Sequence, residues 1–172
     1  ITIRNLTANY NGVDDANLEY GAFLTNWLGI DTNQPVTLNG TNDFKGNLGT
    51  GLFVSSFGIV TLNNITATAN DDGTDGVNDA QGVDIDASLS VKLTGTNLIN
   101  YNQTNGLEIS SDGTVSLNNV TASNNGDNGL NIDSFGNIVL NNVTANNNVG
   151  GGAVLNNCLK PGANLACSVT GR

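Results

Sequence analysis

An apolar pair, with one residue between its two members, recurs along this chain at a nearly constant spacing. The leucines of successive pairs are 24, 31, 24 and 23 residues apart. The pairs are Val36/Leu38, Val60/Leu62, Val91/Leu93, Val115/Leu117 and Ile138/Leu140, with Ile1/Ile3 as the expected first copy. A fixed period of this length indicates a repeat protein, in which each unit packs against its neighbours and not around one globular core.

A glycine followed by alternating apolar residues is the second marker of each unit. It begins at Gly51, Gly82, Gly106, Gly129 and Gly152. From each of the first four glycines to the next leucine marker the distance is 11 residues. Half of the unit is therefore fixed in length, and the insertions fall in the other half.

Within a unit, apolar and polar residues alternate, which predicts short strands and not helices. In the copy that follows Gly129, for example, Leu130 and Ile132 point to one side and Asn131 and Asp133 to the other. Turn-forming Gly, Asn, Ser and Asp separate the segments. We therefore predict an all-β solenoid with three short strands in each coil of 23–24 residues, each strand pairing with its equivalent about 4.8 Å away. A leucine-rich repeat has a similar period but needs a helix or a leucine and asparagine pattern that these units lack.

The composition fits one extended domain that spans residues 1–172. The chain is 38% hydrophobic and contains 32 asparagines and 22 glycines, which suits a narrow core column better than a wide globular core. We expect an irregular first coil with loop excursions over residues 1–35, regular coils over 36–157 and a closing segment over 158–172. This organisation gives about six coils.

The charge of the chain excludes some partners. A net charge of −10 without histidine argues against nucleic acid, whose backbone would be repelled. No apolar run reaches the length of a membrane span, and the sequence contains no signal peptide. Since it also lacks an initiator Met, we interpret it as a mature or trimmed product.

Paired asparagines recur at one corner of the unit, at Asn63/Asn64, Asn118/Asn119 and Asn141/Asn142. Asparagine tolerates the left-handed backbone of a sharp corner, and stacked amides can hydrogen-bond to one another along the axis. We therefore predict an asparagine ladder through Asn64, Asn119 and Asn142. The same three residues begin Asn-x-Thr sequences, so N-glycosylation is the alternative.

The most acidic stretch, ANDDGTDGVNDAQG, is an insertion between Leu62 and Gly82. Asp71, Asp75 and Asp79 have a spacing that resembles dockerin-type and thrombospondin-type calcium loops, in which alternate carboxylates converge on a hard cation. One calcium ion here, with help from Asp84, is a hypothesis, and we expect no other cofactor. Gly73 stands where such loops carry Asp or Asn, and the terminal Glu is missing, so we favour a solvated acidic loop.

Carboxylates also occupy the outward positions of the glycine-led strands. Asp84 and Glu108 are equivalent in adjacent units, which predicts two carboxyl groups near 5 Å apart, and Asp86 and Asp133 lie on the same face. Such a pair suits a glycosidase or calcium. Of the few basic residues only Lys92 could lie near it, so we favour simple exposed carboxylates and expect no enzyme activity.

Two cysteines, Cys158 and Cys167, flank a Pro-Gly turn near the end of the chain. Nine residues apart and without further Cys or His, they predict a disulfide that closes a terminal loop. Such a bond implies an oxidising environment, outside the cell or on its surface.

The motif Gly-Leu-x-Ile followed by Val-x-Leu-Asn-Asn-Val-Thr-Ala resembles the units of right-handed parallel β-helix repeats in bacterial cell-surface and secreted proteins of the adhesin type. The resemblance is good over residues 36–157, and it implies a structural or adhesive module. Because Ile1, Ile3 and Val169 begin the same strand type at both ends, we expect end-to-end self-association, or coverage by further coils of a longer chain.

Two other functions compete with the structural one. A carbohydrate-binding or polysaccharide-degrading β-helix is the runner-up, with surface polysaccharide as partner. An ice-binding face is the third, but its threonine row (Thr7, Thr66, Thr121 and Thr144) is expected to be interrupted by Asn42 and Asn97.

Overall fold

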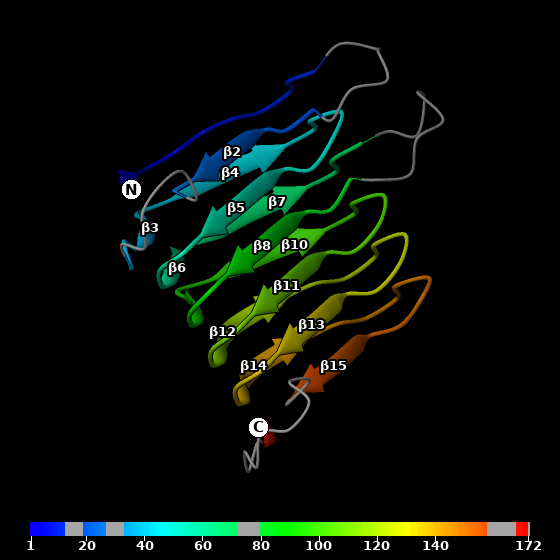
Figure 1. Cartoon of the computed structure of the whole chain (residues 1–172). Helices are drawn as coiled ribbons and strands as arrows, with labels where there is room; N and C mark the ends of the chain where they lie inside the picture. Colours follow the sequence, from blue (N-terminus) through cyan, green and yellow to red (C-terminus); the bar gives the residue numbers. More distant parts are fainter. Residues whose placement is uncertain (13–18, 27–32, 72–79, 158–167, 172) are drawn as a thin grey trace.

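The computed structural model describes residues 1–12, 19–26, 33–71, 80–157 and 168–171. In these ranges the chain is all β, and sixteen strands form two parallel sheets. The strands are stacked one behind another between the N-terminal and the C-terminal end of the molecule (Figure 1). The described residues contain no helix long and apolar enough to cross a membrane.

One sheet has ten strands and the other has six. The ten-stranded sheet consists of β1 (Thr2–Arg4), β3 (Val36–Asn39), β4 (Asn42–Lys45), β6 (Val60–Asn63), β7 (Ile65–Thr68), β9 (Val91–Thr94), β10 (Asn97–Asn100), β12 (Val115–Thr121), β14 (Ile138–Thr144) and β16 (Val169–Gly171). The six-stranded sheet runs in the order β2 (Ala22–Thr25), β5 (Leu52–Ser56), β8 (Val83–Ala87), β11 (Leu107–Ser111), β13 (Leu130–Ser134) and β15 (Ala153–Asn157).

Equivalent positions of successive repeats pair in register. Leu62 lies between Leu38 and Leu93, and Leu117 lies between Leu93 and Leu140. Every one of the strand pairings is parallel, although the paired residues are 23 or more positions apart in the sequence. This confirms the all-β prediction and is consistent with a β-solenoid.

The core is a column of the apolar residues that the alternation places inward. Leu62, Leu93 and Leu117 from the ten-stranded sheet are 0% exposed, as are Ile85 and Leu107 from the six-stranded sheet. At about 25 cal/mol for each Å² of apolar surface removed from water, stacking of equivalent side chains is the main source of cohesion between repeats.

The repeats β5–β7 and β8–β10 have the three strands that the sequence predicts, whereas the repeats β11–β12 and β13–β14 have two. β12 and β14 have seven residues each and continue through the Asn-Asn corner, where β6 and β7 are separate strands. Pairing can run through a corner only where both neighbours have the same corner length. β12 and β14 share that length, whereas β3–β4 and β9–β10 carry one extra corner residue.

That extra residue also corrects the position of Asn42 and Asn97. We expected them in the outward threonine row, but Asn42 pairs with Ile65 and Asn97 with Val120, and both side chains are buried. The Oδ1 atom of Asn97 accepts a hydrogen bond from the Ile65 amide at 3.1 Å. Asp43 and Leu98 take the outward positions instead.

The corner that contains the asparagine pairs has a left-handed backbone in each repeat. φ is 47° at Asn64, 48° at Asn119 and 54° at Asn142, while Gly40 and Gly95 take 74° and 72° at the same corner. Asn142 Nδ2 donates to Asn119 Oδ1 at 2.7 Å. The repeat that contains Gly95 lies between Asn64 and Asn119. The Oδ1 atom of Asn64 accepts a hydrogen bond from the Thr96 amide at 2.9 Å. The row of amides at this corner is therefore interrupted by glycine.

A longer asparagine ladder, which the apolar repeat pattern does not reveal, lies inside the molecule. The side chains of Asn47, Asn70, Asn102 and Asn125 are buried, and each Nδ2 donates to the Oδ1 of the next asparagine at 2.8–3.0 Å, ending on Asn148. The same Oδ1 atoms also accept from backbone amides of the preceding repeat. The ladder thus satisfies buried backbone amides at the corner that precedes each glycine-led strand.

Candidate functional site

The outward face of the six-stranded sheet carries two rows of side chains that cross its strands. The register of the sheet gives the first row as Phe23, Phe53, Asp84, Glu108, Asn131 and Val154. It gives the second row as Thr25, Ser55, Asp86, Ser110, Asp133 and Asn156. Aromatic, acidic and amide groups therefore follow one another along a single direction.

Asp84 and Glu108 occupy directly paired positions on β8 and β11. Glu108 is fixed by amide donors, since its Oε2 accepts from Asn105 Nδ2 at 2.9 Å and from Gln81 Nε2 at 3.3 Å. Its Oε1 accepts from Asn131 Nδ2 at 3.4 Å. The Glu108 carboxyl group is thus an acceptor held in one place beside Asp84.

Burial of Asp84 raises the pKa of its carboxyl group to about 7, and the nearby charges of Glu108 and Asp86 add to the effect. A backbone hydrogen bond from Ile85 acts in the opposite direction. Burial and Glu108 also raise the pKa of Asp86. Near neutral pH, Asp84 therefore exists in both its protonated and its ionised form, which is the range in which a carboxyl group can act as acid or base.

An aromatic cluster precedes the carboxylates on the same face. Phe23 on β2 stacks on Phe53 on β5 with ring centroids 5.0 Å apart and an interplanar angle of 11°. Tyr20 packs against both rings in tilted orientations, at 5.2 Å and 5.4 Å. The Phe23 side chain is 52% exposed, so the cluster presents an aromatic surface to solvent.

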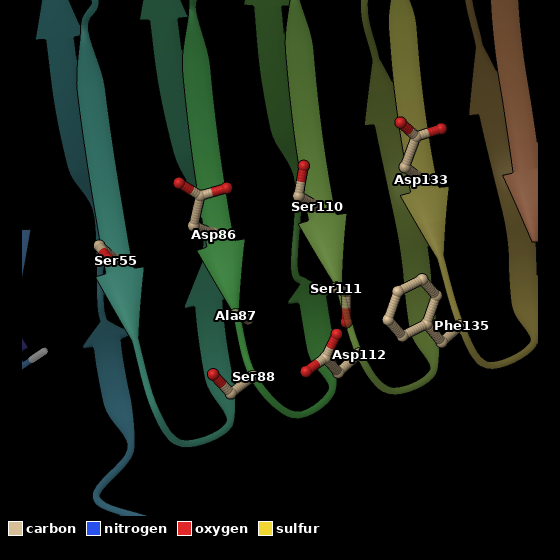
Figure 2. A pocket seen from close by; sticks show the side chains of 9 residues that line it. All are labelled: Ser55, Asp86, Ala87, Ser88, Ser110, Ser111, Asp112, Asp133 and Phe135. Carbon is tan, nitrogen blue, oxygen red and sulfur yellow. The ribbon is translucent and has the colours of Figure 1, made fainter. Parts of the chain in front are cut away.

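A hollow of about 510 Å³ lies at the carboxyl ends of the same strands. Asp86, Ser110 and Asp133 from β8, β11 and β13 line it, and the Phe135 ring lies beside Asp112 at the following corner (Figure 2). Asp133 accepts a hydrogen bond from Asn156 Nδ2 at 2.9 Å. The hollow adds hydroxyl and carboxyl groups to one end of the face.

The basic residues of the described part of the chain lie on the other sheet. Arg4 is on β1, Lys45 on β4 and Lys92 on β9. Lys45 forms a salt bridge with Asp43 at 3.0 Å, and Lys92 pairs with Thr61 and Ser116. The structure therefore does not bring Lys92, the one basic residue considered near the acidic pair, onto the sheet of Asp84 and Glu108.

The predicted calcium site is described only in part. Asp75 and Asp79 lie outside the described residues. Asp71 is buried, has a left-handed backbone with φ of 58° and donates its amide to the Asn47 carbonyl at 2.6 Å. Asp84 lies beside Glu108. Within the described ranges, no group of three or more His, Cys, Asp or Glu side chains could hold a metal ion. Calcium at this loop stays a prediction.

Other predicted positions lie near the ends of the chain. Cys158 and Cys167 lie outside the described residues, so the disulfide also stays a prediction. Ile1 and Val169 are 41% and 47% exposed, and Ile3 pairs with Leu38. The N-terminal ammonium group donates to the Pro35 carbonyl at 2.9 Å.

Comparison with known proteins gives no family for the chain: no family model matches, and neither a curated protein nor a solved structure matches significantly. The geometry of the face itself therefore carries the functional argument. Asp84 with Glu108 can exchange protons or attract a cation, and the exposed rings can stack on a flat ligand. The sequence does not place Phe23 beside Phe53, because two insertions flank Phe23 and obscure the equivalence of the two residues.

Proposed function

We propose that this chain is an extracellular structural and adhesive module, folded as a right-handed parallel β-helix of about six coils with 23–24 residues in each regular coil. The observation that carries the proposal is the unbroken in-register pairing that links β1 through β3, β6, β9, β12 and β14 to β16. Each repeat contributes the same apolar positions to one column. A design of this kind provides length, rigidity and a repeated outer surface.

Self-association at the ends of this stack is part of the proposal. β1 pairs only with β3 and β16 only with β14 among the described strands. An unpaired strand edge binds another edge readily, and two different ends that meet produce a heterologous contact, which propagates into a filament. Further coils of a longer chain are the alternative partner for both ends.

Electron microscopy and sedimentation velocity at increasing protein concentration test the assembly. We expect filaments, or a rising sedimentation coefficient, for the native chain and their loss in Ile3→Lys, which places a charge at the β1 end. Lys92→Thr, a change on an interior strand, is the control and should assemble normally. Short rods that stay monomeric at every concentration would remove self-assembly from the proposed function.

The extracellular location rests on the predicted Cys158–Cys167 bond. Intact-mass analysis of the secreted chain before and after reduction detects this bond directly, because reduction of a disulfide adds two hydrogen atoms. If both thiols react with an alkylating agent before reduction, the argument for an oxidising compartment is lost.

Polysaccharide cleavage is a second candidate, favoured by the direct pairing of Asp84 with Glu108. One carboxyl group of such a pair can protonate a glycosidic oxygen while the other acts as nucleophile or base. Release of reducing ends from a polysaccharide panel tests this activity. Turnover that disappears in Asp84→Asn and Glu108→Gln, but persists in Asp127→Asn on an exposed corner, would place the enzyme ahead of the structural module.

A further inference from the structure

The face of the six-stranded sheet combines an exposed aromatic ring with negative charge. Phe23 is 52% exposed and stacked on Phe53. On the next strand Asp84 is in register with Phe53, and Glu108 follows in register with Asp84. Because neighbouring strands are about 4.8 Å apart, the rings and the two carboxyl groups form one continuous row.

We propose that this row binds a linear polysaccharide whose sugar rings carry free ammonium groups, a polymer of the glucosamine type. The inference rests on the adhesive function proposed above and names its partner. One sugar ring stacks on Phe23, as flat ligands do on exposed aromatic side chains. The ammonium group of a following sugar forms charge-assisted hydrogen bonds with Asp84 and Glu108.

Charge complementarity favours a cationic ligand. The chain has a net charge of −10, and its described basic residues lie on the other sheet. Crowding with Glu108 and Asp86 contributes to the raised pKa of Asp84, so the carboxyl groups of this face repel one another. A bound ammonium group relieves that repulsion, and an aromatic ring next to it adds a cation–π attraction.

The form of the face favours a linear sugar polymer over a basic peptide. β5, β8, β11 and β13 each pair on both sides, so a peptide cannot add to them as an extra strand. The first row continues beyond Glu108 with Asn131, and the second row carries Ser110 and Asn156 on either side of Asp133. Amide and hydroxyl groups at one-strand intervals suit the hydroxyl groups of a polymer that repeats along the same direction.

Isothermal titration calorimetry with the intact chain tests the proposal near neutral pH, where part of the sugar amino groups is protonated and Asp84 is partly ionised. The probes are the hexamer of glucosamine, the hexamer of N-acetylglucosamine and hexalysine. We expect the glucosamine hexamer to bind at least about tenfold more tightly than its acetylated counterpart, because acetylation removes the charge that faces Asp84 and Glu108.

Two variants and one control assign the binding to this row. Glu108→Gln removes the fixed carboxyl group, and Phe23→Leu removes the ring but keeps an apolar side chain. Each substitution should lower the affinity for the glucosamine hexamer about fivefold or more. Asp127→Asn removes the same charge from an exposed corner outside the row and should leave the affinity unchanged. Thermal unfolding of each variant shows whether it is folded.

Several outcomes would overturn the inference. Absence of binding to the glucosamine hexamer is one, and equal binding of the acetylated hexamer is another. If hexalysine binds equally tightly and Phe23→Leu keeps the affinity for the glucosamine hexamer, charge attraction alone would explain the binding. Binding of a neutral polysaccharide in place of the amino sugar would keep the adhesive function and remove only the amino-sugar specificity.

Discussion

At the scale of single residues, Asp84 shows how stacking converts a sequence repeat into electrostatic repulsion. Register places its carboxyl group beside Glu108, and burial together with that neighbour raises its pKa from 3.8 to about 7. The folded chain therefore binds this proton more tightly than the unfolded chain does. Between about pH 4 and pH 7 the free energy of unfolding should fall as pH rises, because the folded state holds more protons in that window.

Asp84→Asn should remove this dependence. At about pH 8 the variant should be more stable than the native chain by up to about 4 kcal/mol, and at about pH 3, where the native carboxyl group is protonated, the difference should vanish. Urea unfolding at the two pH values measures both. Asp127→Asn is the matched control. An equal gain in its free energy of unfolding would show that the net charge of the chain, and not the surroundings of Asp84, causes the effect.

Asn125 belongs to the buried ladder and makes four hydrogen bonds through its side chain. It accepts from the amide and from Nδ2 of Asn102, and it donates to the Ile99 carbonyl and to Asn148. Asn125→Ala should lower the free energy of unfolding by about 3 kcal/mol or more, because buried partners lose their hydrogen bonds. Chemical denaturation measures the loss. The exposed Asn156→Ala should cost less than about 0.5 kcal/mol, and similar losses in both would contradict a special role for the ladder.

At the scale of the strand, a charge should destabilise the fold strongly at an inward position of β12 and hardly at all at an outward position. Leu117 is 0% exposed between Leu93 and Leu140. Leu117→Asp places an unpaired charge in the apolar column, costs several kcal/mol and should abolish cooperative unfolding. Ser116→Asp on the outer side of the same strand should leave the melting temperature within a few degrees. Equal effects in a thermal melt would reverse the assignment of the two faces.

At the scale of the loop, calcium binding by residues 71–79 remains a hypothesis. A ligand that binds only the folded chain raises stability as its concentration increases. The melting temperature should therefore be higher in millimolar calcium than in chelator, and Asp75→Asn should reduce the difference. The same melting temperature in both solutions would leave this stretch as a solvated acidic loop.

The inward and outward faces of the strands could be predicted from the sequence because the side-chain period of a strand is two and the apolar pairs keep that period. The corners could not be predicted to the same accuracy. One extra residue in the corners that contain Gly40 and Gly95 moves Asn42 and Asn97 from the outer to the inner face, since a shift by one residue inverts a strand. Equal corner length in neighbouring repeats then decides whether a strand continues.

The candidate site was predictable in its acidic part only. Asp84 and Glu108 lie at the same distance from their glycine markers, Gly82 and Gly106, so their pairing follows from the sequence. The contribution of the aromatic cluster depends on the pairing of β2 with β5. That pairing joins residues on either side of insertions, for which sequence periodicity gives no register.

At the scale of the whole molecule, each repeat contacts mainly the repeats before and after it, so the number of repeats should be adjustable. Deletion of residues 115–137, one unit of 23 residues, brings β14 next to β9 and connects Asn102 with Asn148 at the spacing that Asn102 and Asn125 have now. We expect this variant to fold cooperatively, with an m-value lower by about 13%, the fraction of the chain removed.

Deletion of residues 115–126 is the control for that experiment. It removes about half a unit and shifts every later residue to a different phase of the repeat, so the apolar column and the asparagine ladder cannot continue. Circular dichroism and urea unfolding compare the two deletions. Cooperative folding of both, with similar stability, would contradict a fold built from stacked equivalent units.

The direction of the backbone hydrogen bonds has a mechanical consequence. They join one repeat to the next, so they are aligned with the direction in which the strands are stacked (Figure 1). Tension between the two ends of the chain loads the bonds of the outermost strand first, and that strand can peel away while the rest stays paired. A tethered surface module of this type should yield in small steps of one repeat each and lengthen gradually under load.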